Sequence, residues 1–375
     1  MTFIEVDPSI VLAAVRGTRF AQLEGDGVRI TRLPRSATAE IPDGELERVA
    51  SQAAGVHLTL LTAATTLRLH ARWTRILRVG DPVDRSVPVV VASIDGRPVA
   101  RATVPAASVH RLDDAGGWTF EAHPATTVSL TLPTGPPREV DVWLPQAAAI
   151  EGLVVSADAD VAAASPDQRL QWIHYGSSIS QCVEAPDPIS TWPALAAAEL
   201  GWNSTSLGLS GQAMADPVVA RVIRDLTADV VTLKIGINPV TAGSMTRRHF
   251  EPLLHEFVDV VRQGHPETTL VLISPIACPI HEVERGPTLV VDGRAVADPA
   301  GRGMSLREVR ASVDAVVAAR HVEFLDGRDL LGPSEAHLLA DGLHPGPEGY
   351  RVMARRFADR MRILAPLGTT RSGDR

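Results

Sequence analysis

After about residue 165, short apolar runs alternate with segments in which apolar residues recur every three or four positions. The apolar runs are LQWIHY, ADVVTLKIG, TLVLISPIAC and HVEFLDG, which begin at residues 170, 228, 269 and 321. The periodic segments, typical of amphipathic helices, are 187–201, 215–226, 305–320 and 347–364. Alternating buried strands and helices predict a parallel sheet that has helices on both faces.

The first 150 residues carry a different pattern, in which short strands are joined by tight turns. Residues 56–74 alternate in polarity and are rich in Val, Leu and Thr. Residues 88–104 hold Asp95-Gly96 between two apolar runs, which predicts a hairpin. Further strand-like segments are WTFEA, TTVSLTLP and REVDVWLP. This spacing predicts an all-β sandwich or jelly roll.

The change of pattern divides the chain. We expect a β-sandwich (jelly-roll-like) accessory domain at residues 1–160 and an α/β domain at residues 165–366. The linker between them is expected at 157–169, and a disordered tail is expected at 367–375. A length of 375 residues is enough for two domains of ordinary size.

Charge and composition restrict the partners. The net charge of −8 disfavours a broad attraction to nucleic acid or anionic lipid. No stretch is apolar and long enough to span a bilayer, and the first residues lack the basic and apolar regions of a Sec signal peptide. We therefore expect a cytoplasmic protein, and its oligomeric state stays open. Cys182 and Cys278 are expected to be free thiols in that compartment, although both follow strands of one sheet and a pairing stays open.

Small and polar residues stand where strands of the predicted sheet end, and ligands bind at that edge of such sheets. The first strand ends on Gly176-Ser177-Ser178-Ile179. One of these serines can be an ordinary turn residue, whereas the other can be a nucleophile that a neighbouring base activates. Three later segments complete the set: SLGLSGQA at 206–213, GINP at 236–239 and DGLHP at 341–345.

The four segments offer complementary chemical roles. His344 can accept the serine proton, and Asp341 can hold the imidazole in the required tautomer. Three donors for a developing oxyanion are available: the backbone N–H of the serine, the backbone N–H of Gly211 and the side-chain amide of Asn238. The residues together predict serine-dependent acyl transfer.

This constellation resembles the SGNH hydrolases, also called the GDSL esterase/lipase family, over roughly residues 168–364. The first block of that family is Gly-Asp-Ser-Leu/Ile, which reads GSSI here, so the resemblance makes Ser178 the nucleophile. The remaining blocks read LGLSG, GINP and DGLHP. The residues that correspond to the family's catalytic and oxyanion groups are Ser178, Gly211, Asn238, Asp341 and His344.

Two positions depart from the family pattern. Ser177 stands where the family has the aspartate of its first block, and it can replace some of the hydrogen bonding of that carboxylate but not its charge. Pro239 replaces the acid after Asn238. Neither position is the nucleophile or the base, so the departures put the acyl acceptor in doubt and not the acyl chemistry.

A β-sandwich before such a domain resembles a two-domain bacterial branch of the family. The resemblance implies a flavodoxin-like three-layer fold for the second domain and a small-molecule ester or acyl-thioester as substrate. That branch includes esterases that act on small or glycosidic esters, so ester hydrolysis is the first expectation. The branch also includes acyltransferases that modify polyketide natural products, so acyl transfer to such a hydroxyl is the second. A non-catalytic carbohydrate-binding protein is the alternative of another class. The β-sandwich is further expected to form one wall of the substrate pocket.

Simpler interpretations exist for single residues. Asn238 precedes a proline and Gly211 lies in a loop, so each can be an ordinary turn or loop residue without a catalytic role. His281-Glu282 resembles the start of a zinc-protease helix, but no second histidine follows at the needed spacing. We therefore expect no metal and no cofactor. His174 is expected to pack within its strand, and no histidine motif points to Cys182 as a nucleophile.

Overall fold

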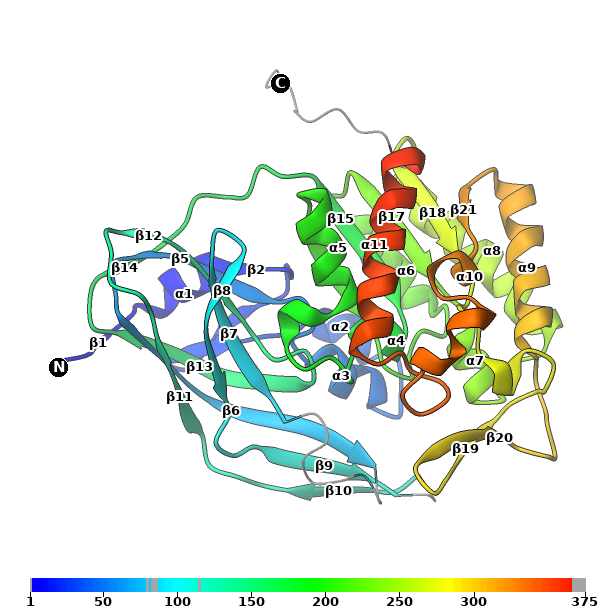
Figure 1. Cartoon of the computed structure of the whole chain (residues 1–375), viewed down its shortest axis with the longest axis horizontal. Coiled ribbons are helices and arrows are strands. Elements are labelled where there is room, and N and C mark those ends of the chain that lie inside the picture. The colour runs from blue at the N-terminus through cyan, green and yellow to red at the C-terminus, as the bar shows by residue number, and fades with distance from the viewer. Residues whose placement is uncertain (1, 79–80, 82–86, 114–115, 366–375) are drawn as a thin grey trace.

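In the computed structural model, which describes residues 2–78, 81, 87–113 and 116–365, the C-terminal part is built on a five-stranded parallel sheet (Figure 1). The strands lie in the order β16-β15-β17-β18-β21, which is the 2-1-3-4-5 order of flavodoxin-like sheets. Their bounds are Gln171–Gly176 (β15), Asn203–Gly208 (β16), Val230–Lys234 (β17), Thr269–Ile273 (β18) and Glu323–Leu325 (β21). The predicted parallel sheet is confirmed. The tail expected at 367–375 lies outside the described residues.

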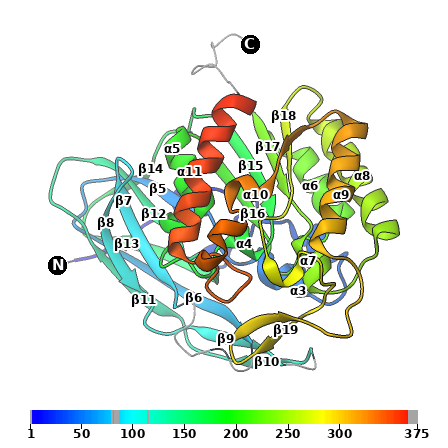
Figure 2. The same cartoon turned by 45° about the vertical axis from the view of Figure 1, so that its right-hand side comes forward.

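Helices cover both faces of this sheet, so the predicted three layers are present (Figure 2). Helices α5 and α11 pack together on one face, and α6, α8 and α9 pack on the other. Their bounds are Trp192–Leu200 (α5), Pro217–Asp225 (α6), Arg247–Gly264 (α8), Leu306–Arg320 (α9) and Pro347–Leu364 (α11). Among the helices within the described residues, none combines the length and apolar character that crossing a bilayer requires.

Alternate side chains of β15 anchor the two helical layers. Trp172 stacks on Phe357 of α11, with ring centroids 4.9 Å apart, and lies 6.2 Å from Trp192 of α5. Tyr175 points to the opposite face and stacks on Phe257 of α8 at 5.1 Å. Successive residues of a strand face opposite sides of a sheet, so this central strand is buried on both faces.

Helix α8 was not among the predicted helices, although its sequence carries a signal. Phe250, Leu254, Phe257 and Val261 are all buried and recur at the spacing of one helical face. Pro252 is the sixth residue of this helix, a position at which proline disfavours a helix because it has no backbone N–H to donate. Helix α8 lies in the crossover connection between the parallel strands β17 and β18.

The N-terminal part contains two sheets packed around their own core. One sheet follows the order β10-β9-β6-β13-β4-β3, with β1 beside β13 and β11 beside β6. The other follows β14-β5-β12-β7-β8, with β2 beside β5. The bounds are Ile4–Glu5 (β1), Val15–Arg16 (β2), Gln22–Glu24 (β3), Gly27–Arg29 (β4), His57–Thr62 (β5), Thr66–Arg78 (β6), Val89–Ile94 (β7), Arg97–Thr103 (β8), Ser108–Leu112 (β9), Trp118–Glu121 (β10), Thr126–Thr131 (β11), Arg138–Trp143 (β12), Ala148–Ala157 (β13) and Val161–Ala163 (β14). The predicted β-sandwich is therefore present.

Two local predictions in this part have different outcomes. The hairpin around Asp95-Gly96 is confirmed: β7 and β8 pair antiparallel, and both turn residues have positive φ. The predicted linker at 157–169 is wrong in part, because β14 lies within it and pairs antiparallel with β5. This segment, rich in Ala and Asp, therefore contains an edge strand of the sandwich.

The two parts share a core. Leu33, Leu46, Val49 and Ala50, in and before α3 (Glu45–Ala50), belong to the apolar cluster of the C-terminal sheet and helices. The division at residues 160–165 stays a prediction. A fragment that began there would lose these side chains from the core around the parallel sheet.

Arg32 is a buried polar link between the two parts. Its side chain is 1% exposed, and its guanidinium donates hydrogen bonds to four backbone carbonyls. Two of these acceptors, on Val49 and Gln52, lie in the N-terminal part at 2.7 and 2.5 Å. The other two, on Ser206 and Gly208, lie at the end of β16 at 3.2 and 2.6 Å. Burial lowers the pKa of Arg32 to about 9.

Arg32→Met is expected to lower the free energy of unfolding by at least about 4 kcal/mol, because four buried carbonyls lose their donor and each such loss costs about 1–3 kcal/mol. The loss is measured by urea denaturation of the full chain. Arg35→Met is the matched control, because the Arg35 side chain is 73% exposed and its ion pair with Glu47 lies at the surface. Equal midpoints for the two variants would contradict the structural role of Arg32.

Candidate active site

The residues of interest lie at the carboxyl edge of the parallel sheet. The short helix α4 (Ser178–Gln181) follows β15, and α7 (Ile237–Thr241), which contains Asn238, follows the neighbouring strand β17. The strand order switches between β15 and β17, because the chain adds β16 on one side of β15 and all later strands on the other. Flavodoxin-like sheets bind ligands at this switch point. The loop that carries Asp341 and His344 precedes α11 and lies at the same edge (Figure 1).

Ser178, His344 and Asp341 form one chain of hydrogen bonds. The Ser178 Oγ lies 2.8 Å from His344 Nε2, and His344 Nδ1 lies 2.7 Å from Asp341 Oδ2. A carboxylate can only accept at neutral pH, so Nδ1 carries the proton and Nε2 faces the serine with its lone pair. The arrangement leaves Nε2 able to take the Ser178 proton.

Asp341 is held as a carboxylate by its own loop. Its Oδ1 accepts the backbone N–H groups of Leu343 and His344 at 2.9 and 2.7 Å. Burial by itself raises the pKa of this carboxyl, but the hydrogen bond and charge of the His344 side chain, together with the two backbone donors, outweigh it. The net pKa of Asp341 lies well below its ordinary value, so Asp341 stays charged beside the imidazole.

The two adjacent serines have separate contacts. Ser177 is fully buried, and its Oγ accepts the backbone N–H of Ile179 at 3.3 Å as the N-cap of α4. Ser178, the first residue of the helix, directs its hydroxyl to His344. Ser177 thus uses its hydroxyl to hold the turn, where the family pattern has an aspartate.

The loop after β16 lies directly against α4. A Cβ at Gly208 would come within 2.5 Å of the backbone N of Gln181, so only glycine permits this approach. The Gln181 side chain accepts the Ser210 N–H at 3.0 Å and donates to the Gln52 side chain of the N-terminal part. These contacts fix the position of Gly211 relative to Ser178.

Most backbone donors around Ser178 already have acceptors. In the loop after β16, the N–H groups of residues 209, 210, 212 and 213 all donate to protein oxygens. Within the described part of the chain, the N–H groups of Ser178 and Gly211 donate to none. Gly211 also has φ +74° and open space beside its Cα. Two predicted oxyanion donors are therefore available to a bound molecule.

Asn238 is oriented by the same loop. Its Oδ1 accepts the Ala213 N–H at 3.0 Å, which leaves the Nδ2 amide to point away from that contact. Among the described residues no acceptor takes the Nδ2 protons. The side chain is 4% exposed, so its orientation is set by packing and by this hydrogen bond.

His174 is packed as predicted. Its two ring nitrogens each lie 2.8 Å from a hydroxyl, on Thr232 of β17 and on Ser180 of α4. Burial, together with the charge of Lys234, lowers the pKa of His174 to about 3, so the ring is neutral. The histidine therefore ties α4 to the sheet beneath it.

The two cysteines are both buried and free. Burial raises the pKa of the Cys182 thiol well above its ordinary value, and raises that of Cys278 to about 12. The thiolate is the nucleophilic form of cysteine, so neither thiol competes with Ser178.

Glu184 is a residue that the sequence reasoning missed. Its Oε1 lies 3.8 Å from His344 Nδ1, and its Oε2 accepts the Tyr350 hydroxyl at 2.8 Å. Its position six residues after Ser178, in a loop outside every motif, gives no sequence signal. Within the described residues, Glu184, Asp341 and His344 each place one possible metal-ligand atom within 4.8 Å of the others. Hydrogen bonds already engage these groups, because His344 Nδ1 donates to Asp341 and the Tyr350 hydroxyl donates to Glu184.

The other metal candidate does not assemble. The His281 ring lies 2.7 Å from the Thr288 hydroxyl, whereas Glu282 forms an ion pair with Arg310 at 2.7 Å. The two side chains therefore serve different structural contacts.

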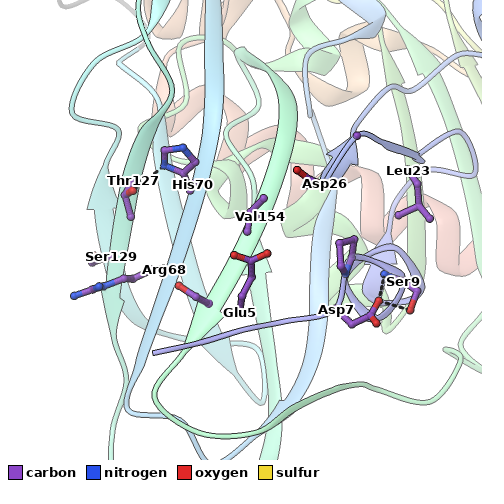
Figure 3. A pocket seen from close by; sticks show the side chains of 13 residues that line it. Glu5, Asp7, Ser9, Leu23, Asp26, Arg68, His70, Thr127, Ser129 and Val154 are labelled. Atoms are coloured by element: carbon purple, nitrogen blue, oxygen red, sulfur yellow. Dashed lines mark hydrogen bonds between the residues drawn. The ribbon is translucent and has the colours of Figure 1, made fainter. Parts of the chain in front are cut away.

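A separate hollow of about 1020 Å³ lies on the N-terminal sheets (Figure 3). Its lining includes Glu5, Asp26, Arg68 and His70, and the His70 ring lies 2.9 Å from the Thr127 hydroxyl. All of its lining residues fall between positions 5 and 156, so it does not include Ser178 or any other predicted site residue.

Comparisons with known proteins place the chain by family and by fold. Residues 174–352 match the model of the GDSL-like lipase/acylhydrolase family. No curated protein matches the sequence. Among solved structures, a salicylyl-acyltransferase, SsfX3, from a tetracycline biosynthetic pathway is 25% identical, with a TM-score of 0.77 over 98% of this chain and 99% of that one.

Two further structures share the fold at lower identity. A GDSL-like protein from Bacteroides ovatus is 18% identical, with a TM-score of 0.72 over 99% of this chain and 100% of that one. An acetyl xylan esterase from the rumen bacterium Butyrivibrio proteoclasticus is 10% identical, with a TM-score of 0.57 over 96% of this chain and 98% of that one. The sequence match and the fold lead to one conclusion: the chain is an enzyme whose residues 174–352 form a domain of the GDSL-like lipase/acylhydrolase family.

Proposed function

We propose that the protein transfers acyl groups through an acyl-enzyme on Ser178, and that its reaction is the hydrolysis of carboxylic esters of small molecules or glycosides. The observation that carries this proposal is the continuous hydrogen bonding from Ser178 through His344 to Asp341, at 2.8 and 2.7 Å. Family membership supports acyl chemistry, and the side-chain geometry supports the assignment of roles.

The proposed reaction has two half-reactions of the same form. His344 Nε2 takes the Ser178 proton while Oγ attacks the substrate carbonyl, and the carbonyl oxygen becomes an oxyanion. The N–H groups of Ser178 and Gly211 and the amide of Asn238 donate to it. Collapse expels the leaving group, to which His344 returns the proton. Water then attacks the acyl-enzyme, with His344 again as base, and releases the acid.

A second candidate is transfer of the acyl group to a hydroxyl of a natural product. The likeness to a salicylyl-acyltransferase, over nearly the full length of both chains, favours it. The two candidates share the acyl-enzyme and differ only in whether water or an alcohol attacks it. Incubation with esters and acyl-thioesters, with and without alcohol acceptors, followed by mass spectrometry of the products, distinguishes them.

We also propose that the N-terminal part forms one wall of the substrate site. Strands β9 and β10, and the hairpin of β19 (Thr288–Val291) and β20 (Arg294–Ala297), lie on the side toward which the carboxyl ends of the parallel strands point (Figures 1 and 2). The hairpin belongs to the C-terminal part, and its Ala295 N–H donates to the Asp341 carbonyl at 2.9 Å, so it lies beside the loop of Asp341 and His344; strands β9 and β10 are the N-terminal elements on this side. Such a wall would exclude water and favour an alcohol acceptor.

Ser178→Ala is expected to abolish both ester turnover and labelling by a fluorophosphonate probe. Ser177→Ala is the matched control: it removes only the N-cap of α4, at a cost of about 1 kcal/mol, and is expected to keep measurable activity and labelling. Labelling is read by intact-protein mass spectrometry. Full labelling of Ser178→Ala would place the nucleophile elsewhere, and a wild type that does not label would favour the non-catalytic carbohydrate-binding alternative.

Asp341→Asn is expected to lower kcat severely, on the order of 10⁴-fold by analogy with other triads, because the amide permits the wrong imidazole tautomer. Circular dichroism should report an intact fold. Wild-type activity should fall at acid pH, since protonation of an imidazole with a reference pKa of about 6.5 removes the base. Turnover near the wild-type level in Asp341→Asn would remove this residue from the triad.

Asn238→Ala is expected to lower kcat by about 10²–10³, with a smaller effect on KM, because the donor binds the oxyanion more strongly than the ground-state carbonyl. Asn238→Asp separates two roles, since it retains an oxygen for the Ala213 N–H and removes the amide donor. Steady-state kinetics should give a similar loss for both variants. An active Asn238→Asp enzyme would make Asn238 a structural residue only.

A further inference from the structure

Two carboxylates face the same edge of the His344 imidazole. Asp341 Oδ2 accepts the single Nδ1 proton at 2.7 Å. Glu184 Oε1 lies 3.8 Å from the same nitrogen, which is too far for a hydrogen bond and close enough for a strong charge interaction. The side chains of His344 and Glu184 are each 15% exposed, so solvent screens this interaction only in part.

Glu184 is held in this position from the other side. The Tyr350 hydroxyl, at the first turn of α11, donates to Glu184 Oε2 at 2.8 Å. Tyr350 is fully buried, and burial, followed by the charge of Glu184, raises the pKa of its phenol well above the ordinary value. The phenol is therefore a neutral donor that turns the other carboxylate oxygen toward the imidazole.

We propose that Glu184 is a positioning residue for the acyl-transfer reaction, a second carboxylate that raises the basicity of His344 and stabilises the imidazolium that forms when Ser178 is deprotonated. This inference rests on the proposed function of Ser178 and His344. Asp341 fixes the tautomer by a hydrogen bond, whereas Glu184 acts only through its charge.

Several titratable groups surround His344. Asp341 lies on its own loop, Ser178 on α4, Glu184 in the loop after α4, and Tyr350 on α11. The Cys278 thiol contacts the carbonyl of Gly342 in the same loop at 3.7 Å, and burial raises its pKa to about 12. Glu184→Gln changes one carboxyl group and leaves the other groups of this set in place, so a change in the pKa of His344 in that variant reports Glu184 itself.

The test is the pKa of the His344 imidazole in the full chain. It is measured by NMR titration, with the resonance assigned by its loss in His344→Gln, and in parallel by the acid limb of kcat/KM. A nearby carboxylate favours the protonated imidazole and raises its pKa, so Glu184→Gln should lower the pKa by about one unit. The acid limb should move to lower pH by the same amount, and kcat on the plateau should fall about tenfold with little change in KM. The glutamine oxygen can still accept from Tyr350.

Glu348→Gln is the matched control, because Glu348 lies on the same helix as Tyr350 with its side chain 64% exposed and paired with Arg351. It should leave the His344 pKa unchanged. An unchanged pKa in Glu184→Gln, or loss of activity without movement of the acid limb, would overturn the proposal. Should Glu184→Gln fail to fold, Glu184→Asp keeps the charge at a greater distance, and a His344 pKa at or above the wild-type value would then overturn it.

The outcomes separate this inference from the proposed function. The NMR titration does not depend on turnover. A lowered His344 pKa in Glu184→Gln, combined with full probe labelling of Ser178→Ala, would retain the charge interaction and reject the serine mechanism. Normal serine chemistry with an unchanged His344 pKa would reject Glu184 alone.

Discussion

The pairing of β15 with strands on both sides is the constraint on which the rest of the site depends. Its residues 172–175 pair with β16 and β17 at the same time, so the strand is fixed by two ladders of hydrogen bonds. Trp172 and Tyr175 lock opposite faces into the helical layers. A one-residue change of register would exchange these faces and remove Ser178 from the edge. Ser178, the proposed nucleophile, has a fixed position because the strand before it cannot slide.

The loop after β16 connects this strand to the N-terminal part. Arg32 donates to the carbonyls of Ser206 and Gly208, and the Gln181 side chain joins Ser210 to Gln52. The N-terminal part thus supports the backbone that carries one proposed oxyanion donor. Oxyanion stabilisation depends on donors that do not rearrange during the reaction, and buried hydrogen bonds from a rigid sandwich satisfy that requirement.

The triad loop combines strong interactions with few residues. Asp341 receives two backbone N–H groups and one imidazole N–H, which offset the cost of burying its charge. Glu184, the proposed second carboxylate, lies 3.8 Å from the imidazole Nδ1 and accepts the Tyr350 hydroxyl. Two acids around one histidine are tolerated because both side chains remain partly exposed. In the proposed mechanism a positive charge also forms between them when His344 takes the Ser178 proton.

The sequence determined the elements and the chemistry by local patterns. Apolar runs and helical periodicity indicated the parallel sheet, and Asp95-Gly96 indicated a hairpin of the N-terminal sandwich. The spacing of DGLHP predicted the contact of Asp341 with His344, because neighbours in a tight turn need no information from the rest of the chain. The roles of Ser178, Gly211 and Asn238 in catalysis are still predictions, although the structure brings their segments together as the sheet order requires.

Only the tertiary structure decided the contacts between distant segments. Strand β14, only three residues long, was interpreted as part of a linker because an edge strand is recognised by its partner and not by its own composition. Glu184 and Arg32 lie in stretches without a motif, and their positions follow from how α11 and β16 pack against them. Long-range packing sets which charged groups become neighbours, and a pattern along the chain does not contain that information.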